Sequence, residues 1–149
     1  MKSLHYLLMK AHTNLNRQIL AGAAKLGLSS GQPKILEFLL NFGESNQKKI
    51  AGYCEIEQTT VGSILLRMEQ SGLIARRQKD GNRRSLYVSL TEKGREAAEA
   101  MRNVFQEADA QAEQDFTEQE LFQLKQSLEK ICAAVCGREI GQEEGDCNE

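Results

Sequence analysis

Basic side chains gather around one predicted turn of this 149-residue chain. Six Lys and Arg residues lie between positions 67 and 84, against only two acidic residues. Asp80-Gly81 is typical of a tight hairpin turn, because glycine adopts a positive φ without steric cost. Residues 86–90 alternate apolar and polar side chains, as a half-buried strand does. Residues 74–91 therefore predict a two-stranded ribbon with arginines at its tip, which suits contact with a polyanion.

A short amphipathic helix is predicted directly before this ribbon, from about residue 58 to residue 70. Its apolar residues recur at i, i+3, i+4 and i+7, so they form one inward stripe: Val61, Ile64, Leu65 and Met68. Projection at about 100° per residue places a small, mostly polar set on the opposite face: Thr59, Thr60, Ser63, Leu66, Arg67 and Gln70. A helix followed by a basic hairpin is the layout of a winged helix-turn-helix, which predicts DNA binding.

The charge distribution agrees with that prediction, although the net charge of −2 does not. Residues 1–47 carry five basic and two acidic residues (+3), and residues 48–95 carry ten and five (+5). Residues 96–149 carry four basic and fourteen acidic residues (−10). A local basic surface is what binds a polyanion, so an acidic chain can still carry a DNA-binding region.

The remaining elements are predicted to be helices. We expect helices at 3–25, from the Ser29 or Ser30 cap to Gly43, at 46–54 with Ser45 as the cap, at 91–115 and at 118–137. Thr117 and Glu120 have the spacing of a capping box at the start of the last helix. The predicted fold class is mainly α with a small β-wing.

We expect a single domain over residues 1–137 and a disordered acidic tail over 138–149. Its winged-helix lobe covers about 30–92. The helices at about 3–25 and 92–137 have more apolar side chains along one face than so small a lobe can bury. We therefore predict a homodimer, in which a second subunit covers them. A two-fold dimer places two recognition helices in successive major grooves.

Several motifs resemble the MarR (multiple antibiotic resistance regulator) family of winged-helix transcription factors. The matching residues are Asn46-Gln-Lys-Lys-Ile-Ala51, Gln58-Thr-Thr-Val61, Arg67-Met-Glu-Gln-Ser-Gly-Leu-Ile74, Arg76-Arg77, Asp80-Gly-Asn-Arg-Arg84 and Val88-Ser-Leu-Thr-Glu-Lys-Gly94. Helices flank them in the family's order, so the resemblance covers roughly residues 3–137. A wing followed by Leu-Thr-Glu-Lys-Gly is the most specific of these features.

The resemblance implies a homodimer that binds pseudo-palindromic double-stranded DNA. Such a regulator is usually a repressor, released by a small aromatic or lipophilic effector or by cysteine oxidation. The implied DNA contacts come from the recognition helix and the wing: Gln58, Thr59, Thr60, Ser63, Arg67, Arg76, Arg77, Lys79, Arg83 and Arg84. Asp80 matches a wing acid that can hold one of the arginines. Glu55 and Glu57 stand where the family commonly has a turn glycine and a serine cap.

Tyr6, Met9 and His12 are the residues that could line an effector pocket, on the family inference alone. Cys54, Cys132 and Cys136 could act as redox sensors, but inert packing is the favoured interpretation of each, because a thiol switch needs an exposed thiolate. No cofactor and no metal site are expected, since no Cys-x-x-Cys occurs and the histidines lie far from the cysteines in sequence.

Two other classes of function remain open from the sequence. One is a winged-helix module for protein–protein contact without DNA binding, which Glu55, Glu57 and the acidic C-terminal third allow. The other is a thiol redox enzyme using Cys132 and Cys136, although no neighbouring base supports it. We expect no enzyme activity and no membrane contact. The N-terminus lacks a full signal sequence, so we expect a cytoplasmic protein.

Overall fold

The computed structural model describes residues 1–79 and 82–136, without the side chains of residues 82–85. The predicted turn at Asp80-Gly81 and the predicted tail at 138–149 lie outside the described residues. The chain divides into two compact units, Met1–Asp109 and Ala110–Glu149. The single domain expected over 1–137 therefore stays a prediction.

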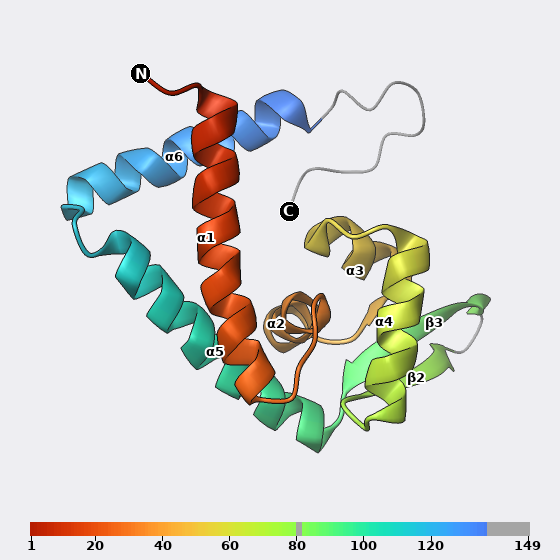
Figure 1. Cartoon of the computed structure of the whole chain (residues 1–149). Coiled ribbons are helices and arrows are strands. Elements are labelled where there is room, and N and C mark those ends of the chain that lie inside the picture. Colours follow the sequence, from red (N-terminus) through yellow and green to blue (C-terminus); the bar gives the residue numbers. More distant parts are fainter. Residues whose placement is uncertain (80–81, 137–149) are drawn as a thin grey trace. The chain divides into compact units, whose positions relative to one another are not determined.

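The first unit contains the whole winged-helix region (Figure 1). Its elements are α1 (Leu4–Lys25), α2 (Gln32–Phe42), β1 (Ser45–Asn46), α3 (Gln47–Cys54), α4 (Gln58–Gln70), β2 (Ile74–Lys79), β3 (Asn82–Leu90) and most of α5 (Glu92–Glu113). The second unit contains the end of α5 and α6 (Glu118–Val135). The predicted fold class, mainly α with a small β-wing, is confirmed.

The sheet has three antiparallel strands in the order β1-β3-β2. In the hairpin, Ile74 pairs with Leu90 and Arg77 pairs with Tyr87, with a register irregularity between Gln78 and Lys79. β1 pairs with the other edge of β3 and was not predicted, because two residues are too few to show alternation. This short strand ties the loop after α2 to the wing.

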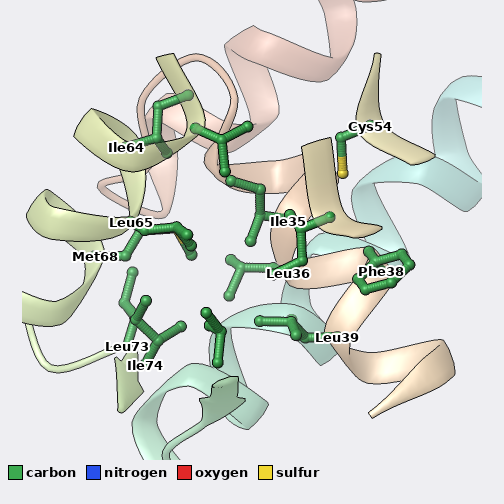
Figure 2. Close-up of a cluster of buried hydrophobic side chains, with 14 of the residues drawn as sticks. Ile35, Leu36, Phe38, Leu39, Cys54, Ile64, Leu65, Met68, Leu73 and Ile74 are labelled. Carbon is green, nitrogen blue, oxygen red and sulfur yellow. The ribbon is translucent and has the colours of Figure 1, made fainter. Parts of the chain in front are cut away.

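The hydrophobic core lies beneath α4. Figure 2 shows Ile64, Leu65 and Met68 of α4 facing side chains of α2 and of the hairpin. Val61 and Leu65 are fully buried, as the predicted stripe requires. Burial of a Leu, Ile or Val side chain contributes about 1.5–3 kcal/mol, so this stripe fixes which face of α4 remains exposed.

Two predicted helix caps are wrong. α2 begins at an N-cap Gly31 with φ 86°, without a side-chain cap, so neither Ser29 nor Ser30 is its cap. Ser45 belongs to β1, and the cap of α3 is Asn46, whose side chain accepts a 2.8 Å hydrogen bond from the Lys49 N–H. In each case a neighbouring residue adopts the backbone geometry of the cap.

The start of α6 confirms the predicted capping box. The Thr117 hydroxyl accepts from the Glu120 N–H at 3.2 Å, and the Glu120 carboxylate accepts from the Thr117 N–H at 2.9 Å. The Thr117 N–H and the Thr117 hydroxyl both donate to the Glu120 carboxylate, and they lower the pKa of that carboxyl. None of the α6 residues is buried within the chain. Among the residues that the structure describes, no helix is both long and apolar enough to cross a membrane.

The junction between the wing and α5 depends on a close backbone approach at Gly94. The Thr91 side chain accepts from the Gly94 N–H at 3.0 Å, and the Thr91 N–H donates to the Leu73 carbonyl at 3.1 Å. A Cβ at Gly94 would collide with the Leu73 carbonyl. Only glycine lets α5 begin this close to the start of the hairpin.

We therefore expect Gly94→Ala to lower the free energy of unfolding by about 1–3 kcal/mol, the usual cost of overpacking. Urea denaturation followed by circular dichroism measures it. Gly52→Ala is the matched control, because a Cβ at Gly52 meets open space within helix α3. That control should stabilise the chain by about 0.5–1 kcal/mol. Equal stability of both variants would show that the approach at Leu73 is not a constraint.

Candidate nucleic-acid interface

Helix α4 presents a mostly polar surface on the side away from the core, in which Leu66 is the one large apolar side chain. All six residues predicted for this face are exposed: Thr59, Thr60, Ser63, Leu66, Arg67 and Gln70. Gln58, in the first turn of the helix, is exposed as well. The Ser63 hydroxyl donates to the Thr59 carbonyl at 3.3 Å, and its oxygen can still accept a hydrogen bond. The surface offers short polar groups and one guanidinium.

The turn before α4 is held by a left-handed residue and a side-chain bond. Glu55 has φ 53°, a conformation that favours glycine, which accounts for the family's preference there. Gln47 donates from its side-chain amide to the Gln58 carbonyl at 2.9 Å, joining α3 to α4. Glu55 and Glu57 are both exposed, and Glu57 is the N-cap of α4 without a side-chain bond.

Arg76 of the wing is a brace between β2 and α4. Its guanidinium donates two hydrogen bonds to the Glu69 carboxylate, at 3.0 and 3.3 Å. Only 18% of the Arg76 side chain is exposed. Because of these bonds, the pKa of the Glu69 carboxyl lies below its usual range. Arg76 therefore fixes the angle between the hairpin and the exposed face of α4.

Arg77 and Lys79 share a different acidic partner. The Arg77 guanidinium donates two hydrogen bonds to the Glu44 carboxylate, at 2.8 and 2.9 Å. The Lys79 ammonium lies 3.3 Å from the same carboxylate and 4.3 Å from the centre of the Tyr87 ring. The Arg77 hydrogen bonds are the largest cause that lowers the pKa of Glu44.

The tip of the wing lies partly outside the described residues. The backbone of Arg83 and Arg84 belongs to β3, but their side chains are not described, and neither is Asp80. The predicted contacts of these three residues therefore stay predictions.

A cavity of about 570 Å³ opens beside the same helix, within the first unit. Residues of α1, α2, α4 and α5 line it, together with Ser30 and Gly31 before α2 and with Ile56: His12, Leu15, Asn16, Ile19, Leu20, Pro33, Lys34, Glu37, Thr60, Ile64, Arg67 and Phe105. Of the three predicted pocket residues, His12 lines the cavity. Tyr6 and Met9 are not among its lining residues, and both are exposed on α1.

Sequence reasoning missed the charged groups of this cavity. Lys34 lies in its wall and is 3.5 Å from the Cys54 carbonyl. Glu37 lies one helical turn further along α2, and burial and then Asp109 raise the pKa of its carboxyl. Arg67 and Thr60 belong both to this wall and to the exposed face of α4. No sequence period marks them, because the cavity is formed by elements far apart in the chain.

The three cysteines named as possible redox residues differ in environment. Cys54 lies in the core, among the buried side chains of Figure 2, and desolvation raises the pKa of its thiol to about 11. Cys132 is a free, exposed thiol on α6. Cys136 is disulfide-bonded, so Cys132 and Cys136 do not form a pair of free thiols. Among the described residues, no three His, Cys, Asp or Glu gather as metal ligands would.

Known proteins resemble this chain in sequence over most of its length. The MarR family model matches residues 28–86. The homoprotocatechuate degradative operon repressor of Escherichia coli is 30% identical over 106 residues, 71% of this chain and 72% of that protein. The HTH-type transcriptional repressor Rv2887 of Mycobacterium tuberculosis is 27% identical over 86% of this chain and 92% of the repressor.

Solved structures share the fold. A MarR-family regulator of Listeria monocytogenes in complex with 26-mer DNA superposes with a TM-score of 0.86 at 21% identity, covering 97% of this chain and all of that one. Rv2887 in complex with salicylic acid gives a TM-score of 0.69 at 26% identity, covering 88% of this chain and 97% of that one.

Three observations point to the same function: the exposed face of α4, the basic hairpin beside it, and relatives in sequence that are themselves repressors. They favour a DNA-binding regulator over a module for protein–protein contact. The chain belongs to the MarR family of winged helix-turn-helix transcriptional regulators.

Proposed function

We propose that this regulator acts in the cytoplasm as a homodimeric repressor that occupies a pseudo-palindromic operator and catalyses no reaction. The single observation that carries the proposal is the exposed polar face of α4 beside a wing that Arg76 and Glu69 brace against it. A helix held at a fixed angle to a basic hairpin can enter the major groove while the hairpin follows the backbone. Steric occupation of a promoter by such a dimer needs no further activity.

The contacts divide by chemistry. On α4, Gln58, Thr59, Thr60 and Ser63 offer short hydrogen-bonding groups to base edges or phosphates, and Arg67 can bind guanine or phosphate. On the wing, Arg83 would enter the minor groove, and Arg84 would bind phosphate or pair with Asp80. Arg77 and Lys79 would add phosphate contacts, whereas Arg76 would act mainly by holding the wing in place.

Exposed apolar side chains support the homodimer. On α1, Leu4, Leu7 and Met9 are exposed, and on α6 so are Phe122 and Val135. Large exposed apolar patches mark interfaces more often than they remain in water. A two-fold dimer that binds successive major grooves would hold its two α4 helices about 34 Å apart, one turn of B-DNA.

The cavity suits a small aromatic carboxylic acid as the effector. Its volume of about 570 Å³ lies within the usual range of small-molecule sites. Leu15, Ile19 and Phe105 give it apolar walls, and Lys34 and Arg67 give it cations that can pair with a carboxylate. Salicylic acid is bound in a structure of the relative Rv2887. An anion held by Arg67 would draw that guanidinium away from DNA.

Footprinting on the DNA upstream of the gene, with and without salicylate, tests the proposal directly. We expect a protected pseudo-palindrome whose half-sites are about one helical turn apart, with protection lost as salicylate is added. Absence of any protected segment on that DNA and on genomic fragments would contradict the proposed repressor.

Arg67→Ala should distinguish a base contact from a phosphate contact. A base contact predicts a loss of about 1–3 kcal/mol in operator binding and relaxed preference at one position, whereas a phosphate contact predicts a salt slope smaller by about one. Fluorescence anisotropy with the operator and single-position variants measures both. Arg102→Ala, an exposed arginine of α5, is the charge-matched control. Unchanged affinity and slope for Arg67→Ala would remove Arg67 from the interface.

Lys34→Met should weaken salicylate binding about tenfold or more, because a hydrogen bond to a charged group contributes about 1.5–3 kcal/mol. Isothermal titration calorimetry of the free protein measures it, with thermal melting to check the fold. Lys48→Met removes an exposed lysine outside the cavity and should leave the affinity unchanged. If both variants bind salicylate as the parent does, Lys34 does not hold the carboxylate.

The chemistry of the Cys54 thiol favours effector binding, rather than oxidation of Cys54, as the event that releases the DNA. With a pKa of about 11, roughly one Cys54 thiol in a thousand is ionised at pH 8, and the thiolate is the reactive species. We expect iodoacetamide at pH 8 to label Cys132 and leave Cys54 unlabelled until urea unfolds the chain. Mass spectrometry of the labelled peptides reports both sites. Fast labelling of Cys54 in the folded protein would reopen its sensor role.

A further inference from the structure

One carboxylate holds the two cations on the outer face of the wing. Glu44 lies in the loop between α2 and β1, 33 residues before Arg77 in the chain. Its two oxygens accept both hydrogen bonds of the Arg77 fork, and one of them also lies 3.3 Å from the Lys79 ammonium. Tyr87 of the central strand β3 supports Lys79 from the side through a cation–π contact.

The exposed fractions show that these cations remain accessible. The Arg77 side chain is 66% exposed and that of Lys79 is 46% exposed, whereas only 20% of Glu44 is exposed. Arg76, by contrast, is only 18% exposed in its pair with Glu69. The Glu69 pair is therefore part of the packing, whereas the Glu44 pair lies at the surface, where a polyanion can compete for both cations.

We propose that Glu44 is a specificity-determining residue, an internal counter-ion that occupies Arg77 and Lys79 and so suppresses binding of the wing to phosphates of unrelated DNA. The proposal rests on the proposed DNA-binding function. A phosphate and a carboxylate both accept two hydrogen bonds from the same edge of an arginine guanidinium, so they compete for it. Phosphate contacts carry no sequence information. In a complex with unrelated DNA, phosphate contacts supply essentially all of the affinity, so occupying these two cations weakens that complex most. At the operator, the contacts of α4 carry more of the binding, and the loss there is smaller.

The salt dependence of binding reports this competition. Each cation that moves onto B-DNA phosphate releases counter-ions and steepens the slope of log K against log salt by about 0.9. A cation already neutralised by Glu44 contributes less, because its displaced carboxylate regains counter-ions. Glu44→Gln keeps the size of the side chain and removes its charge.

We therefore expect Glu44→Gln to bind a random-sequence duplex several-fold more tightly at low salt, with a slope steeper by about one to two. Operator affinity should rise less, so the ratio of operator to random-sequence affinity should fall. Fluorescence anisotropy titrations of the full chain over a series of KCl concentrations measure all three quantities. Glu99→Gln removes the same charge from an exposed position on α5 and should change the slope by much less.

A double variant separates this role from a structural one. In an Arg77→Gln/Lys79→Gln background, Glu44→Gln should no longer change the slope, because the cations that it frees are gone. That background removes two wing cations and leaves Glu44 unpaired, so it should itself weaken binding to both duplexes; the test is therefore the effect of Glu44→Gln within it. A change of slope from Glu44→Gln that is as large in this background as in the parent would overturn the proposal.

Other results would overturn the proposal in distinguishable ways. If the parent binds its operator but Glu44→Gln has the same slope, or weaker binding to both duplexes, Glu44 only positions the wing and the repressor function stands. If the parent binds neither duplex in a salt-dependent way, the DNA-binding function fails, and the role of Glu44 fails with it.

Discussion

Burial of one apolar stripe on α4 is the constraint on which the rest of the structure depends. Val61, Leu65 and Met68 are fully buried against α2 and the hairpin, so α4 cannot rotate about its axis. Its opposite face must then point outward, whatever that face contains. The inward stripe thus determines which six side chains of α4 face outward, although only Ile64 of the stripe lies in the wall of the cavity.

The wing depends on pairs between residues far apart in the chain. Arg76 is held by a carboxylate of α4, and Arg77 and Lys79 are held by one in the loop between α2 and β1. The surface pair adds little stability, because exposed ion pairs contribute about 0–1 kcal/mol. In the role that we propose for Glu44, its larger effect is on charge: a basic hairpin whose cations are partly neutralised still attracts DNA but holds unrelated sequences less tightly.

The sequence predicted the elements that depend on local periodicity. The bounds of α4 and the capping box of α6 follow from residues within a few positions of one another, and both are confirmed. The caps at Gly31 and Asn46 were mispredicted, because several neighbouring residues can cap and the packing of the chain decides which does. Neither the Glu44 pairs nor the cavity beside Lys34 could be predicted, since each joins elements through contacts that no local pattern encodes.

Helix α4 connects the two ligand-binding surfaces that we propose. Thr60 and Arg67 belong to the wall of the cavity and to the exposed face. An effector can release DNA only to the extent that it binds the DNA-free form more tightly than the bound form. A guanidinium that cannot pair with a carboxylate and with DNA at once provides that difference directly. Coupling between the two surfaces then requires no change in the buried stripe of α4, only a competition for one side chain.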